Sequence, residues 1–282
     1  MTTWLITGIS RGLGLALAEA ALARGDTVIG TTRGSRPALA ESPGTLHVLA
    51  LDMADGAGIA ASVAQAFAIG GRIDVIVNNA GYGLLGAIET ATDEEAACLF
   101  DVDVFGPFRL IRAAMPYLRA QGSGHIVNIT SIAGRAPGPA CALYSAAKYA
   151  LEGLSAALVH EVAPLGIKVT AVAPGAFRTD FLSGHSIRKS APEDAAYLPT
   201  IGRASAAFEA ADGRQPGDPA RAAQALLQLA DSDHPPLHLL LGSDALRRAR
   251  EKIDAVIDEI DGWESMTRST DFPTTASGSP RR

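Results

Sequence analysis

The sequence predicts an α/β doubly wound parallel sheet that forms a single domain. Apolar runs of strand length alternate with segments of helical periodicity through most of the chain, and this alternation is typical of parallel β-α units. A glycine-rich turn joins the first apolar run to the first helical segment. Polar residues follow several of the apolar runs, at the edge where ligands of open parallel sheets bind.

The first half of the chain contains four predicted strands. Each is a short apolar run that ends at glycine or at polar residues, and helical spacing of apolar residues follows the first and the third. Gly25 ends the first helix, because glycine readily adopts the conformation found at helix C-termini. The predicted strands are 3–7, 26–31, 46–51 and 73–77, and the predicted helices are 15–24 and 55–69.

The second half begins with a helix start signal. Thr92 and Glu95 have the spacing of a capping box, which predicts a long helix over 92–120 with Pro107 inside it. The later segments repeat the alternation of strand and helix. The predicted strands are 124–130, 167–172 and 237–241, and the predicted helices are 141–162, 219–229 and 244–260.

Composition excludes several classes of function. The chain has 282 residues, 48% of them hydrophobic, with a net charge of −6 and a pI near 5.5. An acidic chain of this kind is not expected to bind nucleic acid or to carry a basic patch that binds a membrane. No signal-peptide pattern and no membrane-length apolar run is present. Cys98 and Cys141 imply neither a disulfide framework nor a metal site. We expect a cytoplasmic protein without a metal.

The glycine-rich turn predicts a phosphate-binding site. Gly8, Gly12 and Gly14 lie between a strand and a helix, with Ser10, Arg11 and Leu13 among them. Glycines let the backbone approach a pyrophosphate, and the helix N-terminus offers unpaired N–H groups. The spacing G-x-x-x-G-x-G differs from the commonest dinucleotide fingerprint, so the turn alone also fits a tight turn without a ligand.

The end of the second strand favours NADP over NAD. Folds that prefer NAD place an acidic residue about 20 positions after the glycines, and no acidic residue lies between Thr27 and Ala40. Arg33 stands there instead, and Arg11 lies inside the glycine turn. Two guanidinium groups suit a 2′-phosphate. The alternative is that both are solvated surface arginines.

Further polar and small residues follow the third and fourth strands. Asp52, with Met53 beside it, could accept a hydrogen bond from an adenine amine or could begin the helix over 55–69. Asn79, which follows the fourth strand, has the alternative role of hydrogen-bonding loop backbone. Ala80 and Gly81 are small enough for a cofactor to lie against the chain.

The chemistry of the chain is concentrated in residues 128–148. Ser131 follows a strand, and Tyr144 and Lys148 stand four residues apart, so their side chains share one face of a helix. A nearby ammonium favours the phenolate and lowers the pKa of the tyrosine from about 10. A lower pKa suits a proton-transfer group at neutral pH. Taken alone, the Tyr/Lys pair is equally an ordinary surface pair.

The segment 180–219 lacks clean periodicity and carries scattered apolar residues, Phe181 and Phe208 among them. Long segments of this kind in compact domains are usually lids or binding loops, so we predict a substrate-binding lid. The predicted domain spans 1–268, and the Pro/Ser-rich residues 269–282 are predicted to be a disordered tail.

Together these motifs resemble the short-chain dehydrogenase/reductase family, in its single-domain form with a Rossmann-like fold. The resemblance covers residues 3–180 with ordered motifs and the C-terminal segments more loosely. It is carried by Thr7 with the glycine turn, by the run from Asn78 to Gly81, by Ser131, Tyr144 and Lys148, and by Pro174-Gly175 with Thr179.

The resemblance implies hydride transfer between a nicotinamide and an alcohol or carbonyl carbon. Tyr144 would exchange the proton, Ser131 would hydrogen-bond the reacting oxygen, and Lys148 would lower the pKa of Tyr144 and hold the nicotinamide ribose. It also implies pairing of copies, as a homodimer or homotetramer, through helices 92–120 and 141–162. The expected cofactor-binding residues are Gly8, Ser10, Arg11, Gly12, Leu13, Gly14, Arg33, Asp52, Met53, Asn79, Ala80, Gly81, Tyr144, Lys148, Pro174, Gly175, Phe177 and Thr179.

One catalytic position departs from the family pattern. The family usually has asparagine where this chain has Asp103, in the context Phe100-Asp-Val-Asp103. The asparagine takes part in a proton relay to the lysine, largely through its main-chain carbonyl, which aspartate also has. The added carboxylate is expected to raise the pKa of a nearby cation.

The main hypothesis is an NADP-dependent carbonyl reductase or alcohol dehydrogenase that acts on a fairly apolar small molecule. One alternative is an NAD-linked dehydrogenase of the same family. Another is a redox-sensing regulator that binds the dinucleotide without catalysis, although such relatives typically lose the tyrosine or the lysine, which this chain retains.

Overall fold

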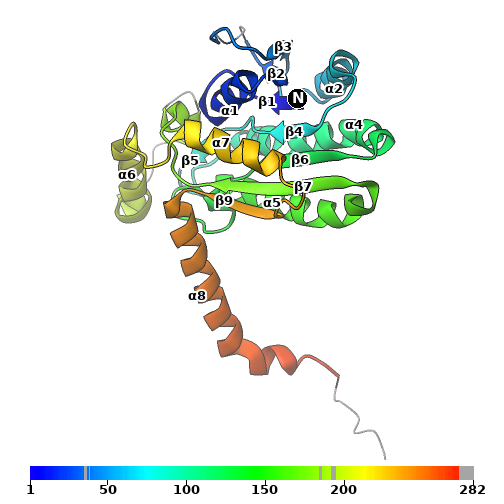
Figure 1. The fold of residues 1–282 in the computed structure, drawn as a ribbon. Coiled ribbons are helices and arrows are strands. Elements are labelled where there is room, and N and C mark those ends of the chain that lie inside the picture. Colours follow the sequence, from blue (N-terminus) through cyan, green and yellow to red (C-terminus); the bar gives the residue numbers. More distant parts are fainter. Residues whose placement is uncertain (35–36, 38, 184–185, 192–194, 273–282) are drawn as a thin grey trace, which may run out of the picture.

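Seven parallel strands form the central sheet of the computed structural model, in the order β3-β2-β1-β4-β6-β7-β9. Helices cover both faces of the sheet (Figure 1), so the predicted doubly wound α/β sheet is confirmed. The structure describes all residues except 35–36, 38, 184–185, 192–194 and 273–282. Most of the predicted tail therefore lies outside the described residues.

The elements alternate along the chain much as the sequence pattern predicts. The strands of the central sheet are β1 (Thr3–Thr7), β2 (Thr27–Thr32), β3 (Thr45–Ala50), β4 (Val75–Asn78), β6 (Gly124–Ile129), β7 (Ile167–Pro174) and β9 (His238–Leu241). The helices are α1 (Gly12–Ala23), α2 (Gly56–Gly70), α3 (Asp93–Phe100), α4 (Gly106–Gln121), α5 (Ala142–Val162), α6 (Arg203–Ala211), α7 (Pro219–Ala230) and α8 (Ser243–Arg268).

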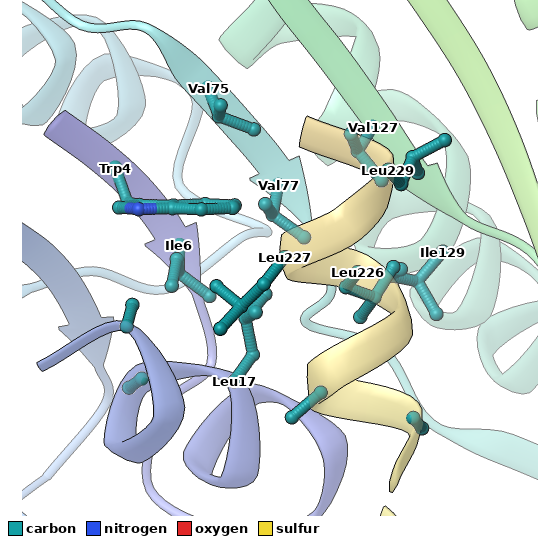
Figure 2. Packing of buried hydrophobic residues seen from close by; sticks show 14 of the residues in the cluster. Trp4, Ile6, Leu17, Val75, Val77, Val127, Ile129, Leu226, Leu227 and Leu229 are labelled. Carbon is teal, nitrogen blue, oxygen red and sulfur yellow. The ribbon is translucent and has the colours of Figure 1, made fainter. Parts of the chain in front are cut away.

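The core lies on both faces of the sheet, as expected for parallel strands that are buried on both sides. Successive side chains of β1 alternate between the faces. Trp4 and Ile6 pack with Leu17 of α1 and Leu227 of α7, and Figure 2 shows this packing around Val75 and Val77. Leu5 faces the other layer, where α2 and α4 cover the sheet.

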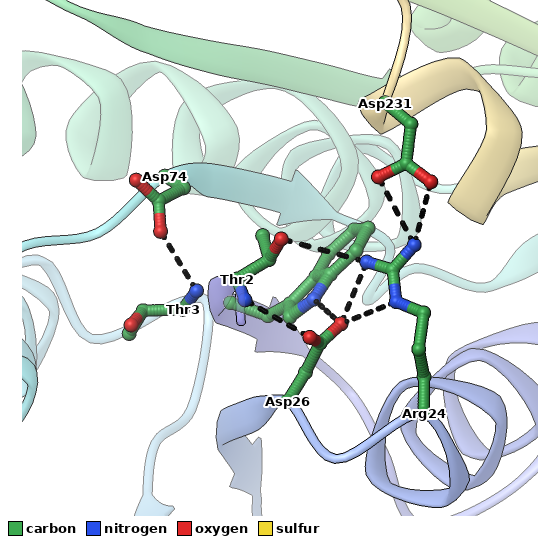
Figure 3. Close-up of polar contacts among 7 residues, drawn as sticks. Thr2, Thr3, Arg24, Asp26, Asp74 and Asp231 are labelled. Carbon is green, nitrogen blue, oxygen red and sulfur yellow. Dashed lines mark hydrogen bonds and ion pairs between the residues drawn. The ribbon is translucent and has the colours of Figure 1, made fainter.

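A polar cluster joins the start of the sheet to two helices (Figure 3). The Arg24 guanidinium donates to Asp26 at 2.6 and 2.8 Å and to Asp231, after α7, at 2.8 and 3.0 Å. Trp4 Nε1 also donates to Asp26, at 3.0 Å. Burial by itself raises the pKa of Asp26, but the Thr2 amide, Trp4 and Arg24 together hold that pKa below its usual value. The cluster therefore fixes the end of α1 against β1.

The order of strands determines where a ligand can bind. From β1 the chain moves outward to β2 and β3, then returns to β4 on the other side of β1. A crevice forms at the carboxyl ends of strands where the direction changes in this way. The glycine turn after β1 and the polar run after β4 both lie at this point.

The predicted continuous helix over 92–120 is wrong. Thr92 and Glu95 do form the capping box, but α3 ends at Phe100, and a turn of π-helix over Asp101–Phe105 precedes α4. Pro107 lies in the first turn of α4, where its missing N–H breaks no helical hydrogen bond. The π-helical turn contains Asp103, and such insertions are frequent at functional sites.

The segment 180–219 has more regular structure than its pattern predicts. The short strand β8 (Ile187–Lys189) pairs in parallel with β5 (Gly83–Leu85), and α6 follows further along. The predicted helix over 244–260 extends to Arg268 as α8. These elements were missed because strands of three residues and a helix without a buried face carry little periodicity.

Candidate active site

A large cleft opens at the carboxyl ends of β1 and β4. Its volume is about 960 Å³, at the upper end for small-molecule sites. All but two of the residues expected at the site line it. The predicted residues that line the cleft are Gly8, Ser10, Arg11, Gly12, Leu13, Arg33, Asp52, Met53, Asn79, Ala80, Gly81, Ser131, Tyr144, Lys148, Pro174, Gly175, Phe177 and Thr179. The two exceptions, Gly14 and Asp103, lie directly behind lining residues.

The end of β1 is tied to the end of β4 by hydrogen bonds. The amides of Asn79 and Ala80 both donate to Thr7 Oγ1 at 3.0 Å. The Asn79 side chain donates back to the carbonyls of Thr7 at 2.9 Å and Gly8 at 3.0 Å. Asn79 therefore hydrogen-bonds the loop backbone, one of the two roles that the sequence left open, and it also borders the cleft.

Two glycines in the turn are required by close approaches of the backbone. Gly8 has a φ of +73°, and a Cβ there would lie 3.0 Å from Ala80 Cα. A Cβ on Gly14 would lie 2.3 Å from both Asn79 Nδ2 and the Gly8 carbonyl oxygen. The turn therefore packs closely against Asn79 and Ala80 at the N-terminus of α1, where helix amides without helical partners are available to an anion. This geometry fits the pyrophosphate of a dinucleotide.

Arg33 and Arg11 both line the cleft. Arg33 follows β2, and Arg11 precedes α1 with its Nε 3.8 Å from Asp180 Oδ2. The two elements are neighbours, because β2 pairs with β1 and the Gly8 amide donates to the Thr31 carbonyl at 3.1 Å. Both arginines therefore border the cleft next to the glycine turn.

The helix after β3 does not begin at Asp52. Asp55 is the N-cap of α2 and accepts from the amides of Ala57 and Gly58. Asp52 accepts from the Ala54 amide at 3.0 Å and borders the cleft beside the buried Met53. Of the two roles that the sequence left open, capping of α2 is excluded, and Asp52 remains available to a ligand.

The segment after β7 is held by a residue that the sequence analysis missed. Asp244, in the first turn of α8, accepts from the Ala176 amide at 2.9 Å. A Cβ on Gly175 would lie 2.3 Å from Asp244 Oδ1, so glycine is needed for this contact. Thr179 Oγ1 accepts a hydrogen bond from the Phe181 amide at 3.3 Å. Asp244 could have been indicated by its position just after the last strand of the sheet, because ligands of parallel sheets bind at the carboxyl ends of strands.

Ser131, Tyr144 and Lys148 meet in the cleft. Ser131 follows β6 and is fixed by the Ala133 amide, which donates to Ser131 Oγ at 3.1 Å. Tyr144 and Lys148 lie one turn apart on α5, with the Lys148 ammonium 5.7 Å from the centre of the Tyr144 ring. The Ser131 hydroxyl faces Tyr144 and lowers the pKa of its phenol. Two hydroxyl groups and an ammonium thus converge on one wall.

Asp103 forms a buried ion pair with Lys148. Its Oδ2 is 3.0 Å from Lys148 Nζ, the carboxyl is fully buried, and the Tyr82 amide donates to Oδ1 at 3.1 Å. Lys148 also donates to the Ile129 carbonyl at 3.3 Å. A Cβ on Gly81 would lie 3.0 Å from Asp103 Oδ2, so the small residue makes room for the carboxylate.

The ion pair changes the proton affinities of both partners. Burial by itself lowers the pKa of Lys148, but the carboxylate of Asp103 outweighs it and the pKa is raised. This is the direction expected from the sequence. Burial raises the pKa of Asp103, and Lys148 and the Tyr82 amide offset this only in part.

The expected lowering of the Tyr144 pKa is wrong. Withdrawal of the phenol from water raises the pKa of Tyr144, and this effect is larger than the lowering by Lys148. The negative charge of Asp103 also raises it, while the Ser131 hydroxyl lowers it. The sequence shows only the neighbouring ammonium of Lys148. The burial of Tyr144 and its distance from the Asp103 carboxylate both depend on the tertiary structure. Tyr144 is therefore protonated at neutral pH.

Apolar residues surround Tyr144 on the side of segment 180–219. The buried Leu85, Cys141 and Ile187 pack together, with Phe181 and Phe208 against them. The Phe181 ring lies 6.2 Å from the Tyr144 ring. Cys141 thus lines the cleft as a small buried hydrophobe. Most residues of segment 180–219 that line the cleft could not be identified from the sequence, because only their packing distinguishes them.

Two other properties of the described part of the chain bear on function. Within it, no three or more His, Cys, Asp or Glu side chains are grouped so as to hold a metal ion. None of the helices described is both long and apolar enough to cross a membrane.

Comparison with known proteins identifies the family. The sequence profile described as "short chain dehydrogenase" matches residues 2–189. "Oxidoreductase BOA17" of Botryotinia fuckeliana is 35% identical over 268 residues, which are 94% of this chain and 97% of the relative. A "3-ketodihydrosphingosine reductase" of Bacteroides thetaiotaomicron is 34% identical over 84% of this chain and 87% of the relative.

Solved structures agree with the sequence comparison. A short-chain dehydrogenase from Streptomyces avermitilis has a TM-score of 0.87 and 42% identity, covering 96% of this chain and all of that one. Structures of similar fold include complexes with NAD and with NADP. With its doubly wound sheet, its glycine turn and its Ser/Tyr/Lys cleft, the chain belongs to the short-chain dehydrogenase/reductase family of oxidoreductases.

Proposed function

We propose that this protein is an NADP(H)-dependent carbonyl reductase or alcohol dehydrogenase. The observation that carries the proposal is the convergence of Tyr144, Lys148 and Ser131 in the cleft that the glycine turn also borders. A proton donor and a dinucleotide site thus share one cavity. That arrangement is what hydride transfer to a carbonyl requires.

The side chains divide the work of carbonyl reduction. NADPH, when bound, supplies the hydride. Tyr144 donates its proton to the carbonyl oxygen, and its raised pKa keeps it in the protonated form that this direction needs. The Ser131 hydroxyl donates a hydrogen bond to the same oxygen and stabilises its developing negative charge. In the reverse reaction the phenolate of Tyr144 accepts the proton of the alcohol.

Lys148 and Asp103 act behind the reacting groups. The ammonium of Lys148 stabilises the phenolate that forms when Tyr144 has given its proton. It would also hold the nicotinamide ribose, as the family resemblance implies. Asp103 fixes the ammonium through the 3.0 Å ion pair and keeps it protonated to alkaline pH. We therefore assign Asp103 as a positioning residue.

The preference for NADP rests on the two arginines at the adenosine end of the cleft. Arg33 occupies the end of β2, where folds that prefer NAD have a carboxylate, and Arg11 lies in the adjoining turn. Arginine binds phosphate through paired N–H donors. The residues that would hold the cofactor are the glycine turn, these arginines, Asp52, the run from Asn79 to Gly81, and the segment after β7.

The substrate is proposed to be a fairly apolar ketone, aldehyde or alcohol. Leu85 and Ile187 are buried beside Tyr144, and Phe181 and Phe208 of the lid complete the apolar wall. Such a wall favours carbon chains or rings next to the reacting carbonyl, because it offers them burial without hydrogen-bonding partners.

Assembly through α4 and α5 is part of the proposal. Phe105 and Phe108, which lie at the start of α4, are 46% and 40% exposed, and Tyr149 on α5 is 43% exposed. Aromatic residues are enriched in protein interfaces. A homodimer or homotetramer through these helices would cover them.

Cofactor titration followed by a carbonyl panel tests the proposal. Binding of NADPH and of NADH is measured by fluorescence, and the better cofactor is then used with apolar ketones and aldehydes. Tighter binding of NADPH, with turnover that is lost in Tyr144→Phe, supports the proposal. Tighter binding of NADH would identify the NAD-linked alternative. Tight binding without turnover on any carbonyl would instead indicate a non-catalytic sensor.

A further inference from the structure

A line of large apolar side chains is exposed along α8. We call it the α8 stripe, and it consists of Leu246, Ile253, Ile257, Ile260 and Trp263. Each side chain is between 42% and 61% exposed. Their spacings of seven, four, three and three residues place them on one face of the helix. Single exposed hydrophobic residues are ordinary, but a contiguous line of five indicates a covered surface.

The described part of the chain leaves this face uncovered. Ala245 and Ala249 at the start of α8 are buried against Ile132 and Ala136, and the helix then projects away from the sheet (Figure 1). Its 26 residues correspond to a length of about 39 Å. Helices gain most of their stability from packing rather than from intrinsic propensity. A partner along the α8 stripe would therefore stabilise the projecting part.

The charges of α8 are divided between its two halves. Residues 244–252 contain four basic and two acidic side chains, whereas residues 253–268 contain five acidic and one basic. Two such helices attract each other when they are antiparallel, because the basic half of each lies along the acidic half of the other. In a parallel pair, like charges would face each other along the whole length.

We infer that a second copy of this chain covers the α8 stripe, with the two α8 helices antiparallel about a two-fold axis. A two-fold axis makes such an interface self-complementary. In one antiparallel register, Leu246 of each copy lies opposite Trp263 of the other, and Ile253 lies opposite Val256. Both pairs fit the same register because they have the same midpoint in the sequence. Each large residue near a helix end then packs against the opposite end of the second helix.

The charge pattern also argues against a membrane as the occupant of the stripe. Amphipathic helices that lie on anionic lipid carry lysine and arginine on the polar face. The projecting half of α8 is acidic, with Asp254, Asp258, Glu259, Asp261 and Glu264 and a single basic residue, Arg268. Such a surface is repelled by anionic headgroups.

Sedimentation analysis of the full chain tests the pairing. The double variant Ile253→Ser, Ile260→Ser removes the centre of the α8 stripe. Ile88→Ser is the matched control, because Ile88 is an isoleucine with a similar exposure, 63%, and lies outside α8. We expect the double variant to sediment with half the mass of the wild type, and the control to retain the wild-type mass. Retained cofactor binding shows that the double variant is folded.

The opposite outcomes overturn the inference. It is wrong if the wild type is a monomer at all concentrations, or if the double variant keeps the full wild-type mass. It is also wrong if the only change is loss of binding to vesicles of anionic lipid. An additional interface through α4 and α5 leaves the test valid, because the double variant would then form a dimer where the wild type forms a tetramer.

Disulfide cross-linking tests the orientation. Leu246→Cys and Trp263→Cys are made separately in a Cys98→Ser background, since Cys98 is exposed. Residues 246 and 263 are about 25 Å apart along the helix, far beyond the Cα separation of a disulfide, about 4–7 Å. We expect cross-links when the two variants are mixed and none in either variant alone. Cross-linking of Trp263→Cys with itself would indicate a parallel pair and refute the antiparallel arrangement.

Discussion

The substitution Asp103→Asn tests how the buried carboxylate controls Lys148. Asp103 is fully buried and its Oδ2 lies 3.0 Å from Lys148 Nζ. At that separation, with an effective dielectric constant of about 20, the attraction is about 5.5 kcal/mol. Asparagine keeps an oxygen that can accept from the ammonium, and such a bond restores about 1.5–3 kcal/mol. The net loss of about 2.5–4 kcal/mol corresponds to a fall of about 2–3 units in the pKa of Lys148.

The sign of the effect follows from the raised pKa of Lys148. A lysine whose pKa is raised by folding contributes to the stability of the folded protein. This contribution is complete below the ordinary pKa of lysine, and it is lost as the pH rises through the pKa that Lys148 has in the folded protein. The wild type should therefore keep the ammonium to alkaline pH. In Asp103→Asn the ammonium should lose its proton nearer neutrality, so that the alkaline limb of kcat/KM for carbonyl reduction moves to lower pH by about 2–3 units.

The matched control is Asp101→Asn in the same π-helical turn. The Asp101 side chain is 41% exposed and pairs with Arg109 at 3.0 Å, away from Lys148. Its substitution should leave the pH–rate profile unchanged. The reasoning is refuted if the Asp103→Asn profile coincides with that of the wild type, because the carboxylate would then have no influence on the charge of Lys148.

Three further predictions address the cofactor, the proton donor and the glycine turn. The double substitution Arg33→Ala, Arg11→Ala should raise the dissociation constant of NADP at least about tenfold, the effect of about 1.4 kcal/mol, and leave that of NAD unchanged. Equal loss for both cofactors in a binding titration would remove the basis for NADP preference. Tyr144→Phe should lower kcat by about 10²–10⁴-fold without weakening cofactor binding. A clearly smaller loss of turnover in stopped-flow measurements would contradict the role of Tyr144 as proton donor. Gly14→Ala should reduce the free energy of unfolding in urea, because its Cβ would lie 2.3 Å from Asn79 Nδ2. Gly153→Ala, with no atom within 4 Å of the added Cβ, should not reduce it.

Much of the fold could be predicted because its signals are local. The apolar runs 3–7 and 167–172 and the helical patterns between strands depend on neighbouring residues only, and the observed elements agree within a few residues. The capping box at Thr92 is equally local. The break at Asp101–Phe105 is different, because this π-helical turn contains Asp103, whose partner Lys148 is distant in the chain. The periodicity of the sequence does not predict this break in the helix.

The α/β class, the order of the motifs and the catalytic and cofactor-binding residues at the strand ends could be predicted from the amino-acid sequence. This was possible because strand ends in a parallel sheet meet at one edge, whatever the details of packing. The direction of the Tyr144 pKa shift, the partner of Lys148, the contact of Asp244 and the apolar wall around Phe181 became apparent only in the folded chain. The physical reason is that burial and through-space charge depend on residues distant in the chain: Asp103 reaches Lys148 from another helix, 45 positions away.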